Sequence, residues 1–304
     1  MVQTFQWEKF TPPFSLSASL LKMDLHKPTL ANKVGKYLAP AFSRIACSSW
    51  LHKPVRAADA YINFLLGKGA GAGWNISEEV ETASEHVHRP APVIFDVGAN
   101  VGDWGSALLR RIPSARLFLF EPSPECQAHI QGLHLPGTRL VPCAVGESNG
   151  KATLHTSSGL DASASLHART ETYFQDRIYH SIEVETVTLD SVIQDEGIAF
   201  VDFLKMDIEG HELAALRGSA AALASQKIGA LSFEFGSGNI NSRTFFRDFW
   251  DLLTSQGFKI GRITPGGTLL ETTAYYEDLE YFRGVSNYVA VLKEHPFRGR
   301  TSQA

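Results

Sequence analysis

Apolar residues follow two different spacings along most of the chain after residue 90, and this pattern predicts strands and helices in turn. Short apolar runs of strand length are followed by apolar residues at three- and four-residue steps. Strands are predicted at residues 93–97, 116–121, 138–145, 182–187, 200–206, 228–235, 257–263 and 286–292. Such alternation is typical of a mostly parallel sheet with helices on both faces. The last two strands have no helix-length pattern between them, so we expect them to pair antiparallel at one edge.

The pattern before residue 90 is different. Between residues 27 and 66, apolar residues recur at helical steps, which predicts about two amphipathic helices broken near Pro40 and Pro54. The glycine-rich stretch 67–73 lacks the Gly-Lys-Ser/Thr ending of a phosphate loop, so we interpret it as a flexible connector. We expect the acidic run 78–85 to form a solvated helix or loop face.

These differences divide the chain into three predicted segments. They are an N-terminal arm at residues 1–26, a helical extension with its glycine-rich connector at 27–89, and an α/β domain at 90–304. A chain of 304 residues is long enough for the α/β domain to bury a full core.

Charge, cysteine content and apolar runs indicate the compartment of the protein and exclude some classes of partner. The formal net charge of -4 argues against a protein that binds nucleic acid or anionic membranes through bulk charge. The cysteines Cys47, Cys126 and Cys143 lack metal-type spacing, so we expect a reducing compartment and no disulfide framework. The first 27 residues lack the pattern of a secretion signal, and no apolar run reaches about 18 residues. We therefore predict a cytoplasmic protein with no membrane span.

The stretch 93–104 carries the first chemical signal. An apolar strand ends in the pattern Asp-x-Gly-x-Asn-x-Gly, formed by Asp96, Gly98, Asn100 and Gly102, and a helical pattern follows. Asparagine tolerates a left-handed backbone, so Asn100 can stand where a dinucleotide fingerprint has its middle glycine. S-adenosylmethionine has no phosphate for such a fingerprint to bind. It has an α-amino group and a ribose, which favour acids and backbone carbonyls, so we predict that this turn binds S-adenosylmethionine.

The next two predicted strands end in residues that suit the rest of this cofactor. Glu121 closes an apolar strand about 20 residues past the glycines, which is the spacing of an acid that binds ribose hydroxyls. Pro122 follows at once and keeps the chain extended as it leaves the sheet. Ala144 and Val145 end the following strand, where small residues could line an adenine pocket.

Five segments together resemble the FkbM-like family of S-adenosylmethionine-dependent methyltransferases. They are Phe-Asp-Val-Gly-Ala-Asn-Val-Gly at 95–102, Phe-Glu-Pro at 120–122, Ala-Val-Gly at 144–146, Thr-Leu-Asp-Ser at 188–191 and Leu-Lys-Met-Asp-Ile-Glu-Gly-His-Glu at 204–212. The resemblance covers roughly residues 90–265. It implies a class I methyltransferase fold, which is a Rossmann-like, doubly wound α/β sheet, mostly parallel with an antiparallel edge. It also implies O-methylation of hydroxyls on sugars or natural products.

The predicted strand 200–206 delivers the candidate catalytic groups. Lys205 is followed by Asp207, Glu209 and His211, all within seven residues. Methyl transfer needs an acceptor hydroxyl that is held in line and loses its proton, and a base contributes a factor of about 10²–10⁴. We favour Asp207 as the positioning acid, with His211 and Glu209 as the next candidates for the base. Lys205 could hold a carboxylate or lower the pKa of the acceptor hydroxyl.

A divalent metal is an alternative that these residues allow but that we do not predict. Asp207, Glu209 and His211, with Glu234 from the end of the next strand, offer hard oxygen ligands and one imidazole. A second well-spaced carboxylate pair is missing. We therefore assign no metal ligands from the sequence.

The segment 156–180 breaks the strand and helix pattern. It is rich in serine, threonine, histidine and arginine and connects two predicted strands above the presumed site. Loops of this length are often binding loops or lids, so we interpret it as a binding loop, with a surface excursion as the alternative. Its polar residues include Ser163, Ser165, His167, Arg169 and Arg177.

The sequence therefore predicts a methyltransferase that uses S-adenosylmethionine to methylate a hydroxyl of a carbohydrate or natural-product intermediate. A nicotinamide-dependent oxidoreductase is the rival enzyme, and the missing Gly-x-Gly-x-x-Gly pattern argues against it. A non-catalytic partner protein with the same fold is a third alternative. Expected partners are a small-molecule or glycan acceptor and no nucleic acid, with a homodimer through the N-terminal helices as an option.

Overall fold

The computed structural model describes residues 30–48, 50–70, 76–168 and 176–294. The predicted arm at 1–26 lies outside these residues. The chain divides into two compact units, Met1–Ala58 and Asp59–Ala304, which we describe separately. None of the helices in the described ranges is both long enough and apolar enough to cross a membrane.

The first unit contains α1 (Leu30–Ala46) and the beginning of α2 (His52–Leu65). The prediction of a break near Pro40 was wrong, because α1 continues through this proline, which removes only one N–H donor from the helix. Pro54 lies in the first turn of α2, where the N–H groups have no helical partner anyway. Several apolar side chains of this unit are exposed, among them Tyr37 and Phe42. A homodimer through these helices stays a prediction.

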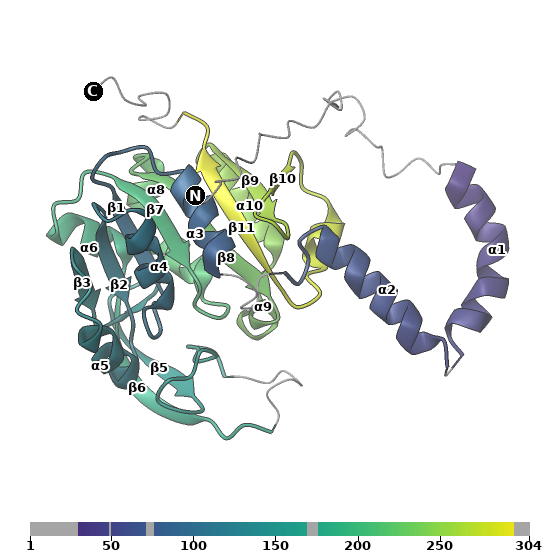
Figure 1. The fold of residues 1–304 in the computed structure, drawn as a ribbon, viewed down its shortest axis with the longest axis horizontal. Helices are drawn as coiled ribbons and strands as arrows, with labels where there is room; N and C mark the ends of the chain where they lie inside the picture. Colours follow the sequence, from purple (N-terminus) through teal and green to yellow (C-terminus); the bar gives the residue numbers. More distant parts are fainter. Residues whose placement is uncertain (1–29, 49, 71–75, 169–175, 295–304) are drawn as a thin grey trace, which may run out of the picture. The chain divides into compact units, whose positions relative to one another are not determined.

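The second unit contains a large sheet, whose strands in the described residues are labelled in Figure 1. They are β1 (Val93–Val97), β2 (Arg116–Phe120), β3 (Thr138–Val141), β7 (Val201–Met206), β8 (Ile228–Gly236), β9 (Phe258–Ile263), β10 (Leu269–Thr272) and β11 (Val285–Leu292). Their order is β10-β9-β11-β8-β7-β1-β2-β3. The neighbours from β3 to β8 pair in parallel, whereas β11 pairs antiparallel with β8 and β9. The predicted doubly wound sheet, mostly parallel with antiparallel strands toward one edge, is confirmed.

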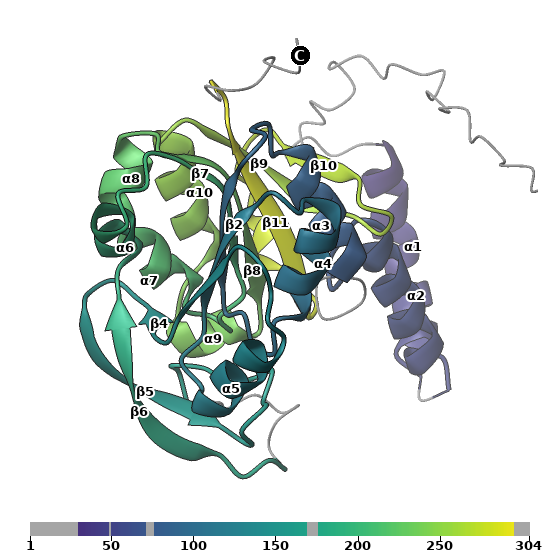
Figure 2. The same cartoon turned by 60° about the vertical axis from the view of Figure 1, so that its left-hand side comes forward.

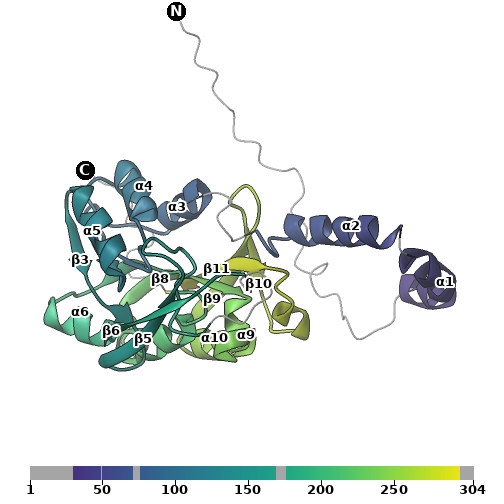
Figure 3. The same cartoon turned by 90° about the horizontal axis from the view of Figure 1, so that it is seen from below.

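Helices cover both faces of this sheet (Figures 2 and 3). One face packs against α3 (Ile76–Glu85), α4 (Asp103–Arg111) and α5 (Pro124–Gly132). The other packs against α6 (Leu189–Asp195), α7 (Glu212–Arg217), α8 (Ala220–Ala224) and α10 (Phe246–Ser255). The short helix α9 (Gly238–Ser242) follows β8, and a 3-10 turn at Glu277–Glu280 precedes β11. These helices cover the two faces of the sheet, and the candidate site lies at the carboxyl ends of the parallel strands.

Strand register sorts apolar and polar side chains onto different faces. Successive side chains in a strand point to opposite faces, and paired residues share a face. On the face covered by α3 and α4, Ile94 and Phe203 are buried in the apolar core. Farther along the same strands and face, Asp96 pairs with Lys205. This face therefore changes from apolar to charged toward the carboxyl ends of the strands.

A second, smaller sheet corrects two strand predictions. Among the described residues it contains β4 (Ala144–Val145), β5 (Gly150–Thr156) and β6 (His180–Val187), in the order β4-β6-β5. The predicted strand 138–145 is split, because Pro142 cannot donate to a ladder and the chain leaves the large sheet there. The predicted strand 182–187 belongs to the small sheet instead of the large one. We missed β5 because most of its residues are polar and only Leu154 and Thr156 are buried.

The described part of the glycine-rich connector packs closely, which corrects the prediction of a flexible segment for residues 67–70. The buried Lys68 ammonium lies 2.7 Å from the Asp278 carboxylate. A Cβ atom on Gly67 would lie 2.3 Å from the Ile263 carbonyl oxygen, so only glycine allows this approach. Residues 71–75 lie outside the described residues.

The aromatic core beneath α10 gives a test of the fold. Phe249 is fully buried and stacks on Phe233 with 4.7 Å between ring centroids, whereas Phe245, just before the helix, is 62% exposed. Phe249→Ala should lower the free energy of unfolding by about 3–5 kcal/mol, because it leaves a cavity in the core. Phe245→Ala is the matched control and should change it little. Urea unfolding of both variants checks this, and equal losses would contradict the packing described.

Candidate active site

The turn after β1 adopts the left-handed geometry that its sequence predicts. Gly98, Asn100 and Gly102 have φ angles of 80°, 47° and 83°. The amides of Gly98 and Ala99 both donate to the Phe120 carbonyl at 3.0 Å, which ties the turn to β2. A Cβ atom on Gly98 would lie 1.9 Å from the Asp207 carbonyl oxygen. Glycine is therefore required where the loops after β1 and β7 approach each other.

Glu121 is held in place by backbone amides at the end of β2. Its two carboxylate oxygens accept the N–H groups of Asn100 and Ser123, each at 2.8 Å. Burial raises the pKa of Glu121 to about 7, and these two hydrogen bonds oppose the rise. Each carboxylate oxygen keeps a further lone pair for a ligand. Glu121 is thus a fixed hydrogen-bond acceptor whose ionisation falls near neutral pH.

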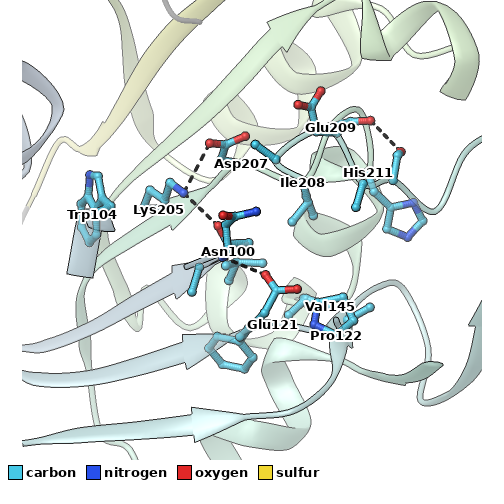
Figure 4. A pocket seen from close by; sticks show the side chains of 18 of the residues that line it. Asn100, Trp104, Glu121, Pro122, Val145, Lys205, Asp207, Ile208, Glu209 and His211 are labelled. Atoms are coloured by element: carbon cyan, nitrogen blue, oxygen red, sulfur yellow. Dashed lines mark hydrogen bonds and ion pairs between the residues drawn. The ribbon is translucent and has the colours of Figure 1, made fainter. Parts of the chain in front are cut away.

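A cavity of about 380 Å³ opens at the carboxyl ends of β1, β2 and β7. Its volume is in the range of sites that bind small molecules and cofactors. Ten of the twelve predicted site residues line it, several of which are labelled in Figure 4: Gly98, Asn100, Glu121, Pro122, Ala144, Val145, Lys205, Asp207, Glu209 and His211. Asp96 and Gly102 do not line it. The individual roles of these residues stay predictions.

Lys205 lines the cavity and contacts three neighbouring groups. Its ammonium is 3.2 Å from a carboxylate oxygen of the fully buried Asp96 and 3.5 Å from one of Asp207. It also donates to the Gly98 carbonyl at 3.2 Å, and Figure 4 shows it reaching toward Asp207. Burial alone lowers the pKa of Lys205, but the charges of Asp96 and Asp207 hold this pKa above its ordinary value. Asp96 therefore acts on the cavity through Lys205.

The residues after β7 do not form the single cluster that their spacing suggests. Figure 4 shows Asp207 beside Lys205, whereas His211 lies across Ile208 from it, near Val145. Burial, reinforced by the charge of His167, lowers the pKa of His211 to about 4. The two imidazoles are joined by a hydrogen bond of 3.1 Å between His211 Nδ1 and His167 Nε2. The imidazole of His211 is therefore neutral at physiological pH.

Two neighbouring acids in this loop have different surroundings. Glu209 lines the cavity with a φ of 56°, an uncommon conformation for a residue other than glycine. Glu212 is fully buried and accepts the N–H groups of Ile208 and Gly210 at 2.9 and 3.3 Å. Glu212 thus closes the loop and does not line the cavity.

The loop before β6 covers one side of the cavity, as we expected for a binding loop. Asp161 and Ser165 line the cavity. Asp161 accepts hydrogen bonds from the amides and hydroxyls of Ser157 and Ser163. Burial alone would raise the pKa of Asp161, but these hydrogen bonds lower it. Of the predicted loop residues, Arg169 lies outside the described residues.

From the sequence we also missed an ionisable residue of the cavity, which lies on α3. Glu79 of α3 lines the cavity, so the prediction that the whole acidic run 78–85 is a solvated face was wrong. Its carboxylate accepts a hydrogen bond of 2.6 Å from the Asn287 amide of β11. Burial raises the pKa of Glu79 to about 7, and the charge of Lys205 opposes this rise. Helical spacing alone does not single out Glu79, because Glu78 likewise lies four residues before a buried residue, Thr82, and does not line the cavity.

Glu234, which the sequence offered only as a ligand in the metal alternative, also lines the cavity from the end of β8. Burial raises its pKa well above the ordinary value, and the charges of neighbouring acids add to this rise. Within the ranges that the structure describes, no three histidine, cysteine or acidic side chains lie arranged to hold a metal ion.

Comparison of the sequence with models of known protein families shows to which family this chain belongs. The model of the methyltransferase FkbM domain matches residues 96–260, from the end of β1 into β9. The chain belongs to the FkbM methyltransferase family. The match includes Glu121 and Asp207, and it confirms the resemblance seen in the sequence motifs. Glu79 and Asn287 lie outside the matched FkbM region.

Three curated methyltransferases are similar to part of this chain. The 2-O-methyltransferase NoeI of Sinorhizobium fredii is 32% identical over 161 residues, which are 47% of this chain and 66% of NoeI. The 31-O-demethyl-FK506 methyltransferase FkbM of Streptomyces tacrolimicus is 30% identical over 43% of this chain and 60% of its own. The hexuronic acid methyltransferase AglP of Haloferax volcanii is 27% identical over 44% and 52%. The chain thus spans less than two thirds of each relative.

The close approach at Gly98 gives a test of the site geometry. Gly98 and Gly266 both have positive φ angles, of 80° and 90°, but a Cβ atom on Gly266 would meet nothing within 4 Å. Each substitution by alanine should cost about 1–2 kcal/mol for the left-handed backbone. Gly98→Ala should cost about 1–3 kcal/mol more, because the new methyl group overlaps the Asp207 carbonyl. Denaturant unfolding measures both, and equal costs would contradict the approach of the two loops.

Proposed function

We propose that this protein is an S-adenosylmethionine-dependent O-methyltransferase that acts on a hydroxyl of a carbohydrate or a natural-product intermediate. The observation that carries the proposal is Glu121, a carboxylate fixed by two amides on the wall of the cavity in an FkbM domain. A fixed acceptor at this strand end suits the two hydroxyls of a ribose. When bound, S-adenosylmethionine supplies a methyl group activated by a sulfonium.

The residues around the cavity fit each part of this cofactor. Glu121 is the ribose acid, and Pro122, Ala144 and Val145 offer a small, largely apolar wall for the adenine. The turn at Gly98 and the side chain of Asp207 lie on the other side of Glu121, where an α-amino group finds carbonyls and a carboxylate. No phosphate-binding feature is needed for this ligand.

The proposed acceptor class rests on the relatives. Two of them are named for methylation at a numbered oxygen and the third for a hexuronic acid. We infer that the acceptor of this protein likewise presents a hydroxyl, which Asp207 positions, with Glu209 or His211 as further candidates for taking its proton and Lys205 holding Asp207. His211 suits a base because its imidazole is neutral above a pKa of about 4. No divalent metal is assigned a role.

Binding of S-adenosylhomocysteine tests the cofactor assignment. Calorimetry should detect it with the wild-type protein, and Glu121→Gln should weaken it by about 10-fold or more, since a hydrogen bond to a charged group contributes about 1.5–3 kcal/mol. Glu147→Gln, a change at a surface carboxylate that is 60% exposed, is the control and should leave binding unchanged. If the protein binds NADH but not S-adenosylhomocysteine, the proposal is wrong and an oxidoreductase is favoured instead.

The pH dependence of this binding follows from the raised pKa of Glu121. The charged form of Glu121 predominates above about pH 7, and this form accepts both ribose hydroxyls. Affinity for S-adenosylhomocysteine should therefore decrease as the pH falls through 7, and binding below this pH should release a proton. Glu121→Gln should remove this dependence. Calorimetry in buffers of different ionisation enthalpy measures the released proton, and the same release from the variant would contradict the role of Glu121.

A methyl-transfer assay tests the reaction itself. Transfer from S-adenosylmethionine to a panel of sugars, glycosides, uronic acids and polyketide alcohols, with and without chelator, should yield a methyl ether on at least one hydroxyl. Bound cofactor without turnover on any of them would instead favour a non-catalytic partner protein.

A further inference from the structure

A row of polar side chains runs across β1, β7, β8 and β11, beginning beside the strand that leads to Glu121. The proposed cofactor site does not use all of these side chains. Paired residues of neighbouring strands place Asp96 beside Lys205, and Glu234 beside Asn287. Since side chains alternate along a strand, all four project from the face of the sheet that α3 covers. Glu79 of α3 faces this row and joins it through the amide of Asn287.

The order of the strands sets the order of these groups along the cavity. The sheet runs β2, β1, β7, β8, β11. Glu121 follows β2, Asp207 follows β7, Glu234 is in β8 and Asn287 is in β11. A ligand whose ribose binds Glu121 therefore extends past Asp207 toward the end that holds Glu79. The acceptor has to approach the methyl group from beyond the cofactor, and this end is lined by the cavity residues Glu79 and Glu234.

Asn287 holds Glu79 in place at this end. It is only 7% exposed, and its amide nitrogen donates to the Glu79 carboxylate at 2.6 Å. Asn287 does not line the 380 Å³ cavity but a separate small space of about 10 Å³ behind Glu79 and Glu234. It therefore acts on the cavity through Glu79, as a positioning residue.

We propose that Glu79 is the base of the acceptor subsite: its carboxylate, held by the Asn287 amide, lines the cavity and takes the proton of the reacting hydroxyl. This inference rests on the proposed methyl transfer. Glu79 is then a catalytic residue that the N-terminal extension contributes from outside the FkbM region, and Asn287 is its positioning residue.

The proposed methyl transfer needs only the acceptor hydroxyl, the cofactor and Glu79. The acceptor oxygen forms a bond to the methyl carbon while the bond from that carbon to sulfur breaks, and the electron pair stays on sulfur. The hydroxyl proton moves to Glu79 and from there to solvent. The products are a methyl ether, S-adenosylhomocysteine and one proton.

Charges around Glu79 suit this task. Lys205 of β7, Asp207 just after β7, Asp96 of β1 and Glu234 of β8 all act on it electrostatically. Burial outweighs the effect of Lys205 and brings the pKa of Glu79 to about 7, close to the operating pH expected of a general base. Asp207 is already paired with Lys205, and His211 lies toward Val145 at the other side of Ile208. Glu79 is thus the better placed base.

Glu79→Gln is the decisive variant, because it keeps the shape and removes the base. In the assay with sugars and glycosides, it should lower kcat by about 10²-fold or more and leave the affinity for S-adenosylhomocysteine unchanged. Wild-type kcat should rise with pH through about 7 and then level off, since Glu79 is ionised above its pKa. The variant should lose this rise. Glu85→Gln, at an exposed acid of the same helix, is the matched control and should behave as wild type.

Asn287→Leu provides a second test that does not remove the base. It deletes a hydrogen bond that lowers the pKa of Glu79, so the rise of kcat should move to higher pH. A role of Asn287 in stability alone would leave the pH profile unmoved.

The possible outcomes separate this inference from the proposed function. Unchanged turnover and an unchanged pH profile in Glu79→Gln would overturn the acceptor subsite. Wild-type protein that binds S-adenosylhomocysteine but methylates no hydroxyl of the sugars and glycosides would overturn it as well. Failure of the wild-type protein to bind S-adenosylhomocysteine would contradict the cofactor assignment instead.

Discussion

The buried ion pair between Lys205 and Asp96 is the interaction on which the site depends. Both side chains are almost fully buried and 3.2 Å apart, and removing two charges from water is costly unless they are paired. Lys205 also binds the Gly98 carbonyl and Asp207, so one ammonium joins β1, its turn and the end of β7. The positions of the turn and of Asp207 relative to each other follow from this contact.

Near this ion pair, burial acts on one carboxyl group at each end of the cavity. Burial brings the carboxyl groups of Glu121 and Glu79 to pKa values of about 7. Glu121 is fixed by backbone amides, which suits binding of hydroxyls that stay intact. Glu79 is held by one side-chain amide and lies near Lys205, which suits exchange of a proton. In the proposed reaction, the local partners of each acid, more than its burial, distinguish the acid for the cofactor from the acid for the acceptor.

Sequence patterns predicted those features that local chemistry determines. The left-handed Asn100, the position of Glu121 just after β2 and the parallel strands follow from short motifs and from hydrophobic spacing. Features set by tertiary packing were harder to predict. The mostly polar β5 forms only because β6 pairs with it, and Glu79 is turned inward because α3 packs on the sheet. The separation of Asp207 from His211 depends on the loop conformation, which spacing along the chain does not determine.

In the proposed reaction, a nucleoside at Glu121 directs the reacting methyl group toward Glu79. A crystal structure with bound S-adenosylhomocysteine tests this arrangement most directly. We expect both ribose hydroxyls within hydrogen-bond distance of the Glu121 carboxylate, the adenine between Pro122 and Val145, and the sulfur facing the side of the cavity that holds Asp207 and Glu79. A sulfur that faces His211, or a ribose away from Glu121, would contradict it.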